Sequence, residues 1–414
     1  MIRLLIICQL SSIISGQKIF DKFEKGRNNN YHSKETFRFD TVPDDGSYTI
    51  LLESVEGGIE VRTHTGAGAE ITIKRKIRAQ TEKKAKELVE SAKILVYHLE
   101  DNQLIQVRSE NKIHYRRNVY TEFELKLPMN INLNLETTGG DIDVTDIRGE
   151  SVFSTSGGDL DLKNLMGRIE AHTSGGNIEV SRLEGFIRVH TSGGNIRIMN
   201  SDGEFNASTL GGDLEFFQLI GNIDAQTSGG SITFRNIESE SVKCRSSGGD
   251  IRAEYISANL TGSTSGGDIQ LESIKGLVDV TTSGGVIKAQ QITGALTCQI
   301  TGGNIEGNGI IGPVDAYTTA GDIELELSYD TSIKDYSFNI ETQSGDIGVT
   351  IPKRLQVNIE SVLYGTKSIK KLNSEIPIKV VSYQNKVVGT GKIGGGLIPL
   401  ILTTYSGSIT INQD

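Results

Sequence analysis

Glycine corners recur along this chain at an almost fixed interval. The last glycine of each corner occupies one of eleven positions, most of them the second residue of a Gly-Gly pair: Gly140, Gly158, Gly176, Gly194, Gly212, Gly230, Gly249, Gly267, Gly285, Gly303 and Gly321. Successive corner positions differ by 18, except for one step of 19 from Gly230 to Gly249. A fixed period of this length is typical of repeat proteins, in which each unit buries its apolar face only against its neighbours. The spacing therefore predicts a solenoid.

One coil shows the expected local structure. After Gly176, the apolar residues Ile178 and Val180 alternate with polar ones, and Ile187 and Val189 do the same on the far side of Gly185. Alternation on both sides of a glycine bend predicts two strands per coil, each with one buried face. The expected fold is all-β: a single-stack parallel β-solenoid, or β-helix, with 18-residue coils. Parallel crossover connections are overwhelmingly right-handed, so we expect the same hand here.

The inward positions keep their character from coil to coil. Two residues after the corner, every coil has Ile or Leu, as in Ile142 and Leu160. Five residues before the next corner the side chain is smaller in most coils, as in Ala171 and Cys244. Large and small columns that face each other would fill a thin core at normal packing density. Ser151 is an exception in an otherwise large column, and we expect Phe153 to fill that space.

The corner residues have expected backbone roles. Reversing the chain within two residues usually requires a positive φ angle, which glycine adopts freely, so we expect this conformation at the corners. A second bend, nine residues after the corner, also carries glycine in most coils, as in Gly149 and Gly185. Threonine precedes most glycine pairs, as in Thr173. Its hydroxyl is expected to cap backbone groups at the turn and to bond its counterparts in neighbouring coils.

The regions outside the repeat are expected to close its ends. Residues 17–136 read as a β-rich N-terminal cap with strands at 47–53, 59–63, 70–76, 104–108 and 120–127 and one amphipathic helix at about 81–95. The regular solenoid is expected over 137–330. Residues 331–414, where the period fails, are read as irregular final coils and a C-terminal cap. Unpaired backbone at the end of a solenoid invites aggregation unless it is covered.

Residues 1–16 read as a signal peptide. Arg3 supplies a positive charge, residues 4–14 are mostly apolar, and Ser15-Gly16 offers small residues for cleavage. A buried N-terminal strand is the alternative. This stretch is too short to span a bilayer and no other stretch approaches that length, so we expect an exported protein without a transmembrane segment. Its expected location is the cell surface, the extracellular space or the periplasm.

Charge and cysteine content exclude several classes of partner. The net charge of −10 argues against nucleic acid, because phosphate binding needs clustered Lys and Arg. After removal of the leader, Cys244 and Cys298 remain, three coils apart in one column. Coils that stack at about 4.8 Å place them roughly 14 Å apart, which is too far for a disulfide. We expect two small buried side chains and neither a disulfide nor a metal site.

A column of Asp and Asn follows the corners and raises the question of calcium. Stacked carboxylates could bind Ca²⁺ as calcium β-rolls do, with the candidate ladder Asp141, Asp159, Asp250 and Asp268. Those rolls need a further glycine that this repeat lacks. The alternative is that these side chains accept backbone N–H bonds at the turn, and we favour it. No cofactor and no metal are expected.

The regular spacing also bears on catalysis. Parallel β-helices that act on polysaccharides need long loops to wall a cleft, and the intervals between 140 and 321 leave no room for insertions. No catalytic motif appears, and His172 and His190 read as two solvated neighbours on an outward column. We therefore expect a protein that is not an enzyme.

The Thr-Ser-Gly-Gly-Asp-Ile corners, the helix-bearing leader region and the terminal Ser-Gly-Ser-Ile-Thr-Ile resemble the putative bacterial adhesins. These are β-solenoids of the domain-of-unknown-function class, related to the head-GIN putative autotransporter adhesins. The resemblance implies a solenoid fold and supplies no catalytic residues. The resulting hypothesis is an adhesin or cell-surface scaffold that binds a protein, a glycan or an envelope component through its repeated faces. A periplasmic envelope-stress or assembly component is the alternative, and a polysaccharide-active enzyme is the third reading.

Overall fold

The computed structural model describes residues 14–15, 17–110 and 118–414. The chain forms two compact units, residues 1–194 and 195–414, which are described separately here. Most of the predicted leader lies outside the described residues. Its described part, Ile14–Ser15, forms β1 and pairs antiparallel with β7 (Ile94–Leu99).

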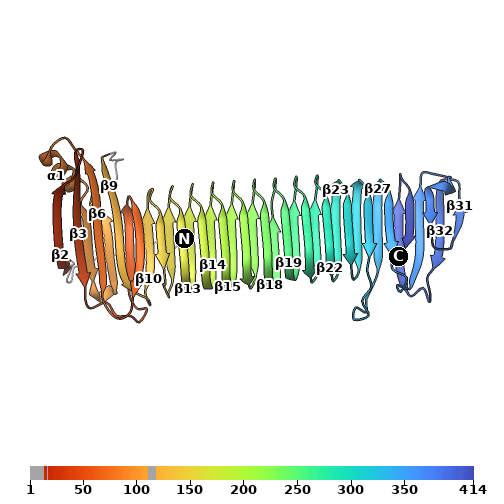
Figure 1. The fold of residues 1–414 in the computed structure, drawn as a ribbon, viewed down its shortest axis with the longest axis horizontal. Coiled ribbons are helices and arrows are strands. Elements are labelled where there is room, and N and C mark those ends of the chain that lie inside the picture. Colours follow the sequence, from red (N-terminus) through yellow and green to blue (C-terminus); the bar gives the residue numbers. More distant parts are fainter. Residues whose placement is uncertain (1–13, 16, 111–117) are drawn as a thin grey trace. The chain divides into compact units, whose positions relative to one another are not determined.

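Parallel in-register strands form the repeated part of the first unit. They are β10 (Asn132–Thr137), β11 (Ile142–Thr145), β12 (Ser151–Thr155), β13 (Leu160–Thr173) and β14 (Ile178–Thr191). In β13 and β14 the partners are one repeat apart in sequence, as for Ile169 and Ile187. Each of these two strands continues through the second bend instead of ending there. The predicted parallel β-solenoid is confirmed, with this difference in the division of strands (Figure 1).

The second unit repeats the same parallel pairing. Its regular strands are β15 (Ile196–Thr209), β16 (Leu214–Ile220), β17 (Ile223–Thr227), β18 (Ile232–Arg245), β19 (Ile251–Thr264), β20 (Ile269–Lys275), β21 (Val278–Thr282), β22 (Ile287–Thr293), β23 (Leu296–Gly302), β24 (Ile305–Ile310), β25 (Val314–Ala320) and β26 (Ile323–Leu327). The one longer interval appears as a register shift between Glu238 and Ser241. An extra residue in a strand is accommodated as a bulge of this kind, so the coils on either side keep their register.

The inward columns form the core of each unit. Ile178 and Ile187 in the first unit are at most 1% exposed, and Ile232 and Ile251 in the second are fully buried. The small column is buried as well, as at Ala225. Ser151 is also buried, and its hydroxyl has no hydrogen-bond partner among the described residues. The alternation of apolar and polar residues thus places the inward columns as predicted.

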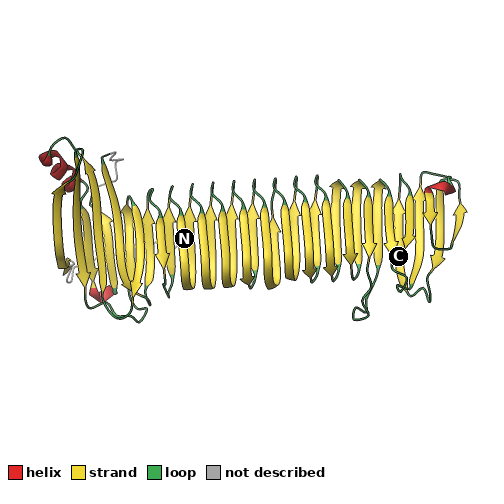
Figure 2. Ribbon diagram, in the orientation of Figure 1, coloured by secondary structure: helices red, strands yellow, loops and turns green. Residues whose placement is uncertain are grey.

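The first unit begins with an antiparallel sheet. Its strands are β2 (Gln17–Lys25), β3 (Asn30–Phe39), β6 (Ala69–Arg78) and β9 (Val119–Pro128), and each pairs antiparallel with the next (Figure 2). The helix α1 (Glu82–Ser91) starts at Thr81, whose hydroxyl accepts the N–H of Lys84. Ala85 on its inner side packs with Tyr31 and Ile77. The helix therefore covers the apolar side of this sheet.

A coil that the repeat spacing missed lies between this sheet and the regular coils. It consists of β4 (Thr49–Val55) and β5 (Gly58–His64). These strands pair in parallel with β10 and β11 on one side, and with β8 (Leu104–Ser109) and β9 on the other. Its corner is Gly57-Gly58, which lies far before Gly139-Gly140 in sequence but next to it in space. After β5 the chain forms β6 to β9 on one side of this coil, and then continues into β10 and β11 on its other side.

The C-terminal part of the second unit keeps the parallel stack and adds a hairpin. Its strands are β27 (Phe338–Ser344), β28 (Ile347–Ile351), β29 (Val357–Tyr364), β30 (Leu372–Ser374), β31 (Ile378–Ser382), β32 (Lys386–Lys392), β33 (Ile398–Thr404) and β34 (Ile409–Gln413). β27 pairs in parallel with β33, and β28 with β34. β32 pairs antiparallel with both β29 and β31. This antiparallel edge replaces the repeat where the glycine period fails.

Candidate functional site

The corner glycines are required by close contact between coils. A Cβ atom on Gly176 would lie 1.9 Å from the carbonyl oxygen of Gly158 in the preceding coil. The first glycine of the same pair, Gly175, has no neighbour closer than 3.9 Å. The backbone of Gly176 is outside the left-handed region, so the expectation of a positive φ is wrong at this corner. It holds at the second bend, where Gly185 has a φ of +130°.

Most of the regular coils also contain a non-glycine residue in the left-handed conformation, which the sequence did not predict. Six residues after the corner, non-glycine residues adopt φ angles between +53° and +63°, at positions 146, 164, 182, 200, 218, 236, 255, 273 and 291. Asn and Asp, which tolerate this conformation, occupy four of these positions. The side chains at the other positions vary from Arg to Tyr, so no single residue type marked the bend. Asn enrichment was the only available signal.

In most coils the hydroxyl of the threonine column makes two hydrogen bonds, one donated to the preceding coil and one accepted from its own corner. The Thr173 hydroxyl donates to the carbonyl oxygen of Gly158 at 2.9 Å and accepts the N–H of Gly176 at 3.2 Å. The same pattern recurs in the second unit, where the Thr282 hydroxyl donates to the carbonyl of Gly267 and accepts the N–H of Gly285. The predicted capping role is therefore present. Between coils the partner is a glycine carbonyl and not another threonine.

The Asp and Asn column after the corners also serves the backbone. The Asp141 carboxylate accepts the N–H of Asp159 at 2.9 Å, and Asp159 in turn accepts the N–H of Asn177 at 2.7 Å. In the second unit Asp250 accepts the N–H of Asp268 at 2.8 Å, and Asp268 accepts that of Val286 at 2.8 Å. All four residues of the candidate calcium ladder thus take part in bonds of side-chain oxygens to corner N–H groups, but each bond joins two successive coils and does not lie within a single turn. Across the described ranges, no group of three or more His, Cys, Asp or Glu residues is arranged to hold a metal ion.

The two described cysteines are buried and unpaired. Cys244 lies beside Gly262, and Val280 and Cys298 occupy the next two coils in the same column. Burial raises the pKa of each thiol to about 12. Thiolates are the reactive and metal-binding form, so neither side chain is prepared for that chemistry. Cys8 lies outside the described residues.

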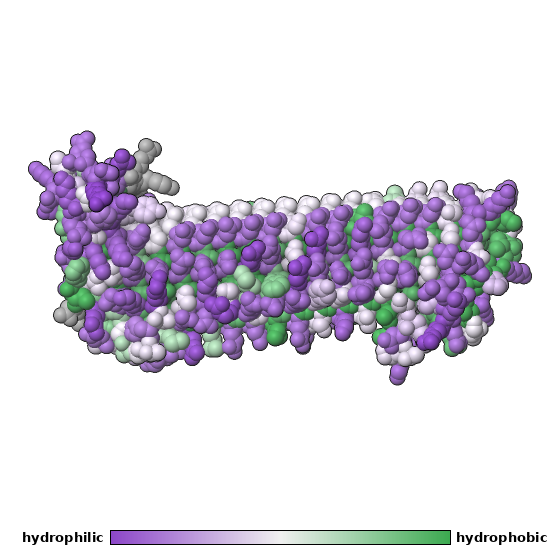
Figure 3. Space-filling model, viewed as in Figure 1, coloured by the Kyte–Doolittle hydropathy of each residue, from purple (hydrophilic) through white to green (hydrophobic). Residues whose placement is uncertain are grey.

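Outward side chains of the second unit pair between coils. The Arg197 guanidinium donates to Glu215 at 2.7 Å, Lys288 lies 3.1 Å from Glu306, and both pairs are about half exposed. Arg252 donates to Gln270 at 2.8 Å in the same column. The hydrophilic side chains on the visible face can be followed in Figure 3. Regular strands without projecting loops leave these faces as charged, ordered surfaces.

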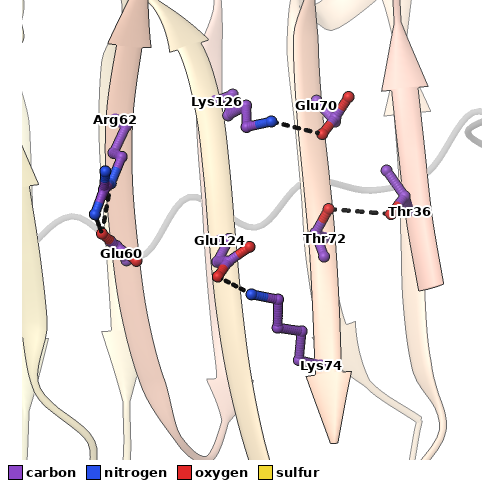
Figure 4. A network of polar contacts seen from close by, with 8 residues as sticks. All are labelled: Thr36, Glu60, Arg62, Glu70, Thr72, Lys74, Glu124 and Lys126. Atoms are coloured by element: carbon purple, nitrogen blue, oxygen red, sulfur yellow. Dashed lines mark hydrogen bonds and ion pairs between the residues drawn. The ribbon is translucent and has the colours of Figure 1, made fainter. Parts of the chain in front are cut away.

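An acidic ladder runs along the outward face of the first unit. Glu124, Glu60, Asp143, Asp161 and Glu179 occupy directly opposed positions on successive strands. Burial, and then the charge of Asp161, raises the pKa of the Asp143 carboxyl. Basic neighbours offset part of the repulsion. Arg62 pairs with Glu60 and Lys74 with Glu124 (Figure 4), and Lys163 pairs with Asp161.

The two outward histidines lie against each other as predicted from their column. The rings of His172 and His190 are stacked, with centroids 5.2 Å apart and planes at 4°. Burial, and then the charge of His190, lowers the pKa of His172. Arg168 lies over the ring of Phe186 in the same region, 4.3 Å from its centroid. The two rings thus form a stacked pair on the surface, and Ser154 occupies the position directly opposite His172 on the preceding strand.

A basic groove lies on the antiparallel sheet of the first unit. It has a volume of about 1240 Å³ and is lined by the outward residues of β2, β3, β6 and β9. Figure 4 shows Lys74 extending from β6 toward Glu124 of β9, and Thr72 beside Thr36 of β3. The groove has no signal in the sequence, because its residues become neighbours only through the antiparallel pairing of four strands.

A buried ion pair underlies the same sheet. The Arg75 side chain is 1% exposed and lies 2.5 Å from Glu35, which also pairs with Lys18 at 2.6 Å. Burial acts to raise the pKa of Glu35, but hydrogen bonds from Lys18 and Arg75 outweigh it, so that pKa is lowered. This pair fixes the positions of β2, β3 and β6 relative to one another.

The match to a protein family lies within the second unit. Residues 205–382, which are less than half of the chain, match the family model Toastrack DUF4097. This match supports a β-solenoid of the domain-of-unknown-function class, while the relation to the head-GIN adhesins stays a prediction. The comparison with curated proteins gave no significant match.

Two solved structures align with the chain. A protein described as a putative cell adhesion protein from Clostridium sporogenes ATCC 15579 has 9% identity and a TM-score of 0.17, with 92% of this chain and 100% of that chain covered. A protein described as a putative lipid binding protein from Parabacteroides distasonis ATCC 8503 has 14% identity and a TM-score of 0.21, with 76% and 96% covered. Among the helices of the described residues, none has the length and apolar character needed to cross a membrane.

Proposed function

We propose that this protein is a non-enzymatic, exported β-solenoid that acts as an adhesin or cell-surface scaffold. Its repeated outward faces would bind a protein, a glycan or a component of the cell envelope. One observation carries the proposal. The polar residues that could have formed a site at the corners are already engaged in bonds between coils, as Thr173 and Asp159 are. The outward faces are what the repeat leaves available to a partner.

The surface chemistry of these faces supports binding rather than catalysis. Charged side chains stand in columns and pair from one coil to the next, as Arg197 does with Glu215. Exposed pairs of this kind contribute only about 0–1 kcal/mol to stability. Such pairs therefore contribute little to holding the coils together, which agrees with a role in binding at the surface. A protein that binds through such a face gains many weak, regularly spaced contacts.

Two other functions are the alternatives to this proposal. A periplasmic envelope-stress or assembly component would use the same faces in another compartment. A polysaccharide-active enzyme would need a cleft, and one hollow of the second unit, of about 540 Å³, lies beside Glu306 and Glu324. Glycosidases use two carboxylates of which one has a raised pKa. A loop, residues 328–337, leaves the stack between β26 and β27 (Figure 1), and Glu306 lies directly opposite Glu324, so an activity assay has to decide this third reading.

Protease shaving of intact cells tests the location. A known periplasmic protein serves as the control for envelope integrity. Cleavage of this protein in intact cells, with the control protected, is the result expected for an adhesin. Protection until the envelope is opened would overturn the surface location and favour the periplasmic alternative.

A separate assay tests the absence of catalysis. The purified protein is incubated with a panel of neutral and acidic polysaccharides, and the release of reducing ends or unsaturated products is measured. We expect no turnover. Cleavage that is lost in Glu306→Gln or Glu324→Gln would show that the acidic hollow is an active site and overturn the proposal.

A further inference from the structure

Three lysines lie directly opposite one another on adjacent strands of the antiparallel sheet. Lys22 of β2 faces Lys34 of β3, and Lys34 faces Lys74 of β6. Neighbouring strands are about 4.8 Å apart, so the three side chains leave the sheet in a row with that repeat. Like charges in directly opposed positions destabilise a sheet. The repulsion among these three lysines must therefore be offset by nearby negative charge, either from the protein or from a bound ligand.

The sheet itself compensates only part of this charge. Lys22 pairs with Glu24 at 2.6 Å, and Lys74 pairs with Glu124. Lys34, Lys76 and Arg78 have no carboxylate within ion-pair distance among residues 17–110 and 118–414; Lys34 instead lies over the ring of Phe20, 5.6 Å from its centroid. Lys76 and Arg78 follow on the same face of β6, and all three side chains are exposed. Three cations are thus free to meet a ligand.

The groove around these cations also has apolar and hydrogen-bonding walls. Phe20 and Tyr120 line it on the outer strands, and their side chains are 43% and 68% exposed. Asn28, Asn30 and Asn118 line it as well. Exposed aromatic rings offer flat surfaces for the C–H faces of sugars, and asparagine amides can bond hydroxyl groups through both donor and acceptor. Cations alone would suit any polyanion, but this combination suits a sugar polymer.

We propose that this groove binds a linear acidic polysaccharide, whose carboxylate, sulfate or phosphate groups lie against Lys34, Lys76 and Arg78. The sugar rings pack on Phe20 and Tyr120, and the chain runs across the strands along the lysine row. The local charge agrees with this assignment. The residues that line the groove include Lys22, Lys34, Lys74, Arg75, Lys76 and Arg78 against Glu24, Glu56 and Glu122. The lining thus carries an excess of positive charge, whereas the whole chain has 42 Lys and Arg against 52 Asp and Glu.

The rest of the molecule disfavours other polyanions. Its acidic remainder, including the ladder from Glu60 to Glu179 on the same unit, repels a ligand that is larger than the groove. A duplex nucleic acid and a flat anionic membrane would both approach these carboxylates. A single polysaccharide chain can occupy the groove and avoid them.

Binding of fluorescent octasaccharides to the full chain tests the proposal. The probes are an octagalacturonate, a heparin octasaccharide and neutral malto-octaose, and anisotropy is measured at low and moderate salt. The test variant is K34Q/K76Q/R78Q, which removes cations that have no ion pair to lose. The matched control is K243Q/R245Q/K275Q, three exposed cations on the second unit. Chemical unfolding of both variants verifies that they are folded.

We expect at least one acidic octasaccharide to bind, with a Kd that rises at least tenfold in the groove variant and stays within twofold in the control. The dependence of log Kd on log salt should become shallower in the groove variant, because fewer counterions are released. F20A/Y120A should weaken binding without changing that salt dependence.

Several results would overturn the proposal. They are failure of both acidic octasaccharides to bind, equal binding of malto-octaose, and equal loss in the control variant. Tighter binding to phosphatidylglycerol vesicles or to single-stranded DNA would reassign the groove to a membrane or to nucleic acid. The proposal concerns a surface other than the repeated faces. A negative binding result would therefore not contradict the proposed scaffold function. Protease protection in intact cells would likewise not contradict binding of a polysaccharide in the groove.

Discussion

The hydroxyl of Thr173 donates a 2.9 Å hydrogen bond to the carbonyl oxygen of Gly158, one coil earlier. The same hydroxyl accepts the N–H of Gly176 in its own corner. Thr173 is fully buried, so neither backbone group can turn to water if the hydroxyl is lost. A single buried oxygen thus satisfies two backbone groups in successive corners.

Replacing this hydroxyl by a methyl group should be costly. Thr173→Val keeps the shape but leaves a buried N–H and a buried carbonyl without this partner, at about 1–3 kcal/mol for each group left unsatisfied. The free energy of unfolding, from urea titration followed by circular dichroism, measures the loss. Thr173→Ser keeps the hydroxyl and should lose clearly less. A smaller loss in Thr173→Val than in Thr173→Ser would show that the methyl packing matters and the hydroxyl bonds do not.

The two glycines of one corner should differ sharply in their tolerance of alanine. Gly176→Ala places a Cβ 1.9 Å from a carbonyl oxygen, so the coils must separate, at a cost of about 3 kcal/mol or more. Gly175→Ala meets nothing closer than 3.9 Å and should change stability by less than about 1 kcal/mol. Thermal unfolding of the two single variants provides the comparison. Similar melting temperatures would refute the close-contact explanation.

The acidic column should respond to the hydrogen-bonding capacity of its side chains and not to calcium. Asp159→Asn retains an oxygen that accepts the N–H of Asn177, whereas Asp159→Leu removes it and should cost about 1 kcal/mol. Added Ca²⁺ should leave the melting temperature unchanged, since a ligand that binds only the folded state would raise it. A rise with Ca²⁺ that disappears in Asp159→Asn would instead establish a calcium site.

Stability of the first unit should decrease as the pH falls through the histidine range. Burial lowers the pKa of His98 below its ordinary value of 6.5, and Glu100 opposes this only in part. A depressed folded-state pKa means that the unfolded chain binds the proton more readily. The stabilisation is therefore complete above pH 6.5 and is lost as the pH falls below it. Unfolding free energies at pH 8 and pH 5.5 should show a smaller difference in His98→Gln than in the unaltered protein.

Both described cysteines should be unreactive in the folded protein. Their thiols are fully buried with pKa values raised to about 12, so the thiolate is scarce at pH 8. We expect slow labelling of Cys244 and Cys298 by iodoacetamide, and fast labelling in urea, read by mass spectrometry. Fast labelling of Cys298 alone would show that its coil opens independently.

The sequence predicted most of the repeated structure because each coil restates it. A column that is ambiguous in one coil can be assigned from the others. The alternation of apolar and polar residues was enough to predict that Ile187 and Ile223 are buried. The reason for the corner glycines could not be predicted in the same way. At Gly176 a side chain is excluded by the backbone of the preceding coil. The neighbouring residues in sequence do not reveal this contact.

The N-terminal region shows where such prediction ends. Gly57-Gly58 has the form of a corner, but its long separation in sequence from Gly139-Gly140 hides that they are neighbours. The lysine row has the same origin. Lys22, Lys34 and Lys74 become adjacent only through antiparallel pairing of strands that are separate in the chain. Periodicity within a strand carries no information on which strands meet.

The bonds between coils have a direction, and this restricts how copies of the chain can join. Each threonine hydroxyl reaches back to the preceding coil, and each Asp or Asn oxygen receives an N–H from the following one. The two surfaces exposed by separating any pair of coils are therefore chemically different. When either surface meets its own copy about a twofold axis, these threonine and carboxylate bonds between coils cannot form. Stacks that lose their terminal cover would join head to tail, which produces open-ended polymers and not closed dimers.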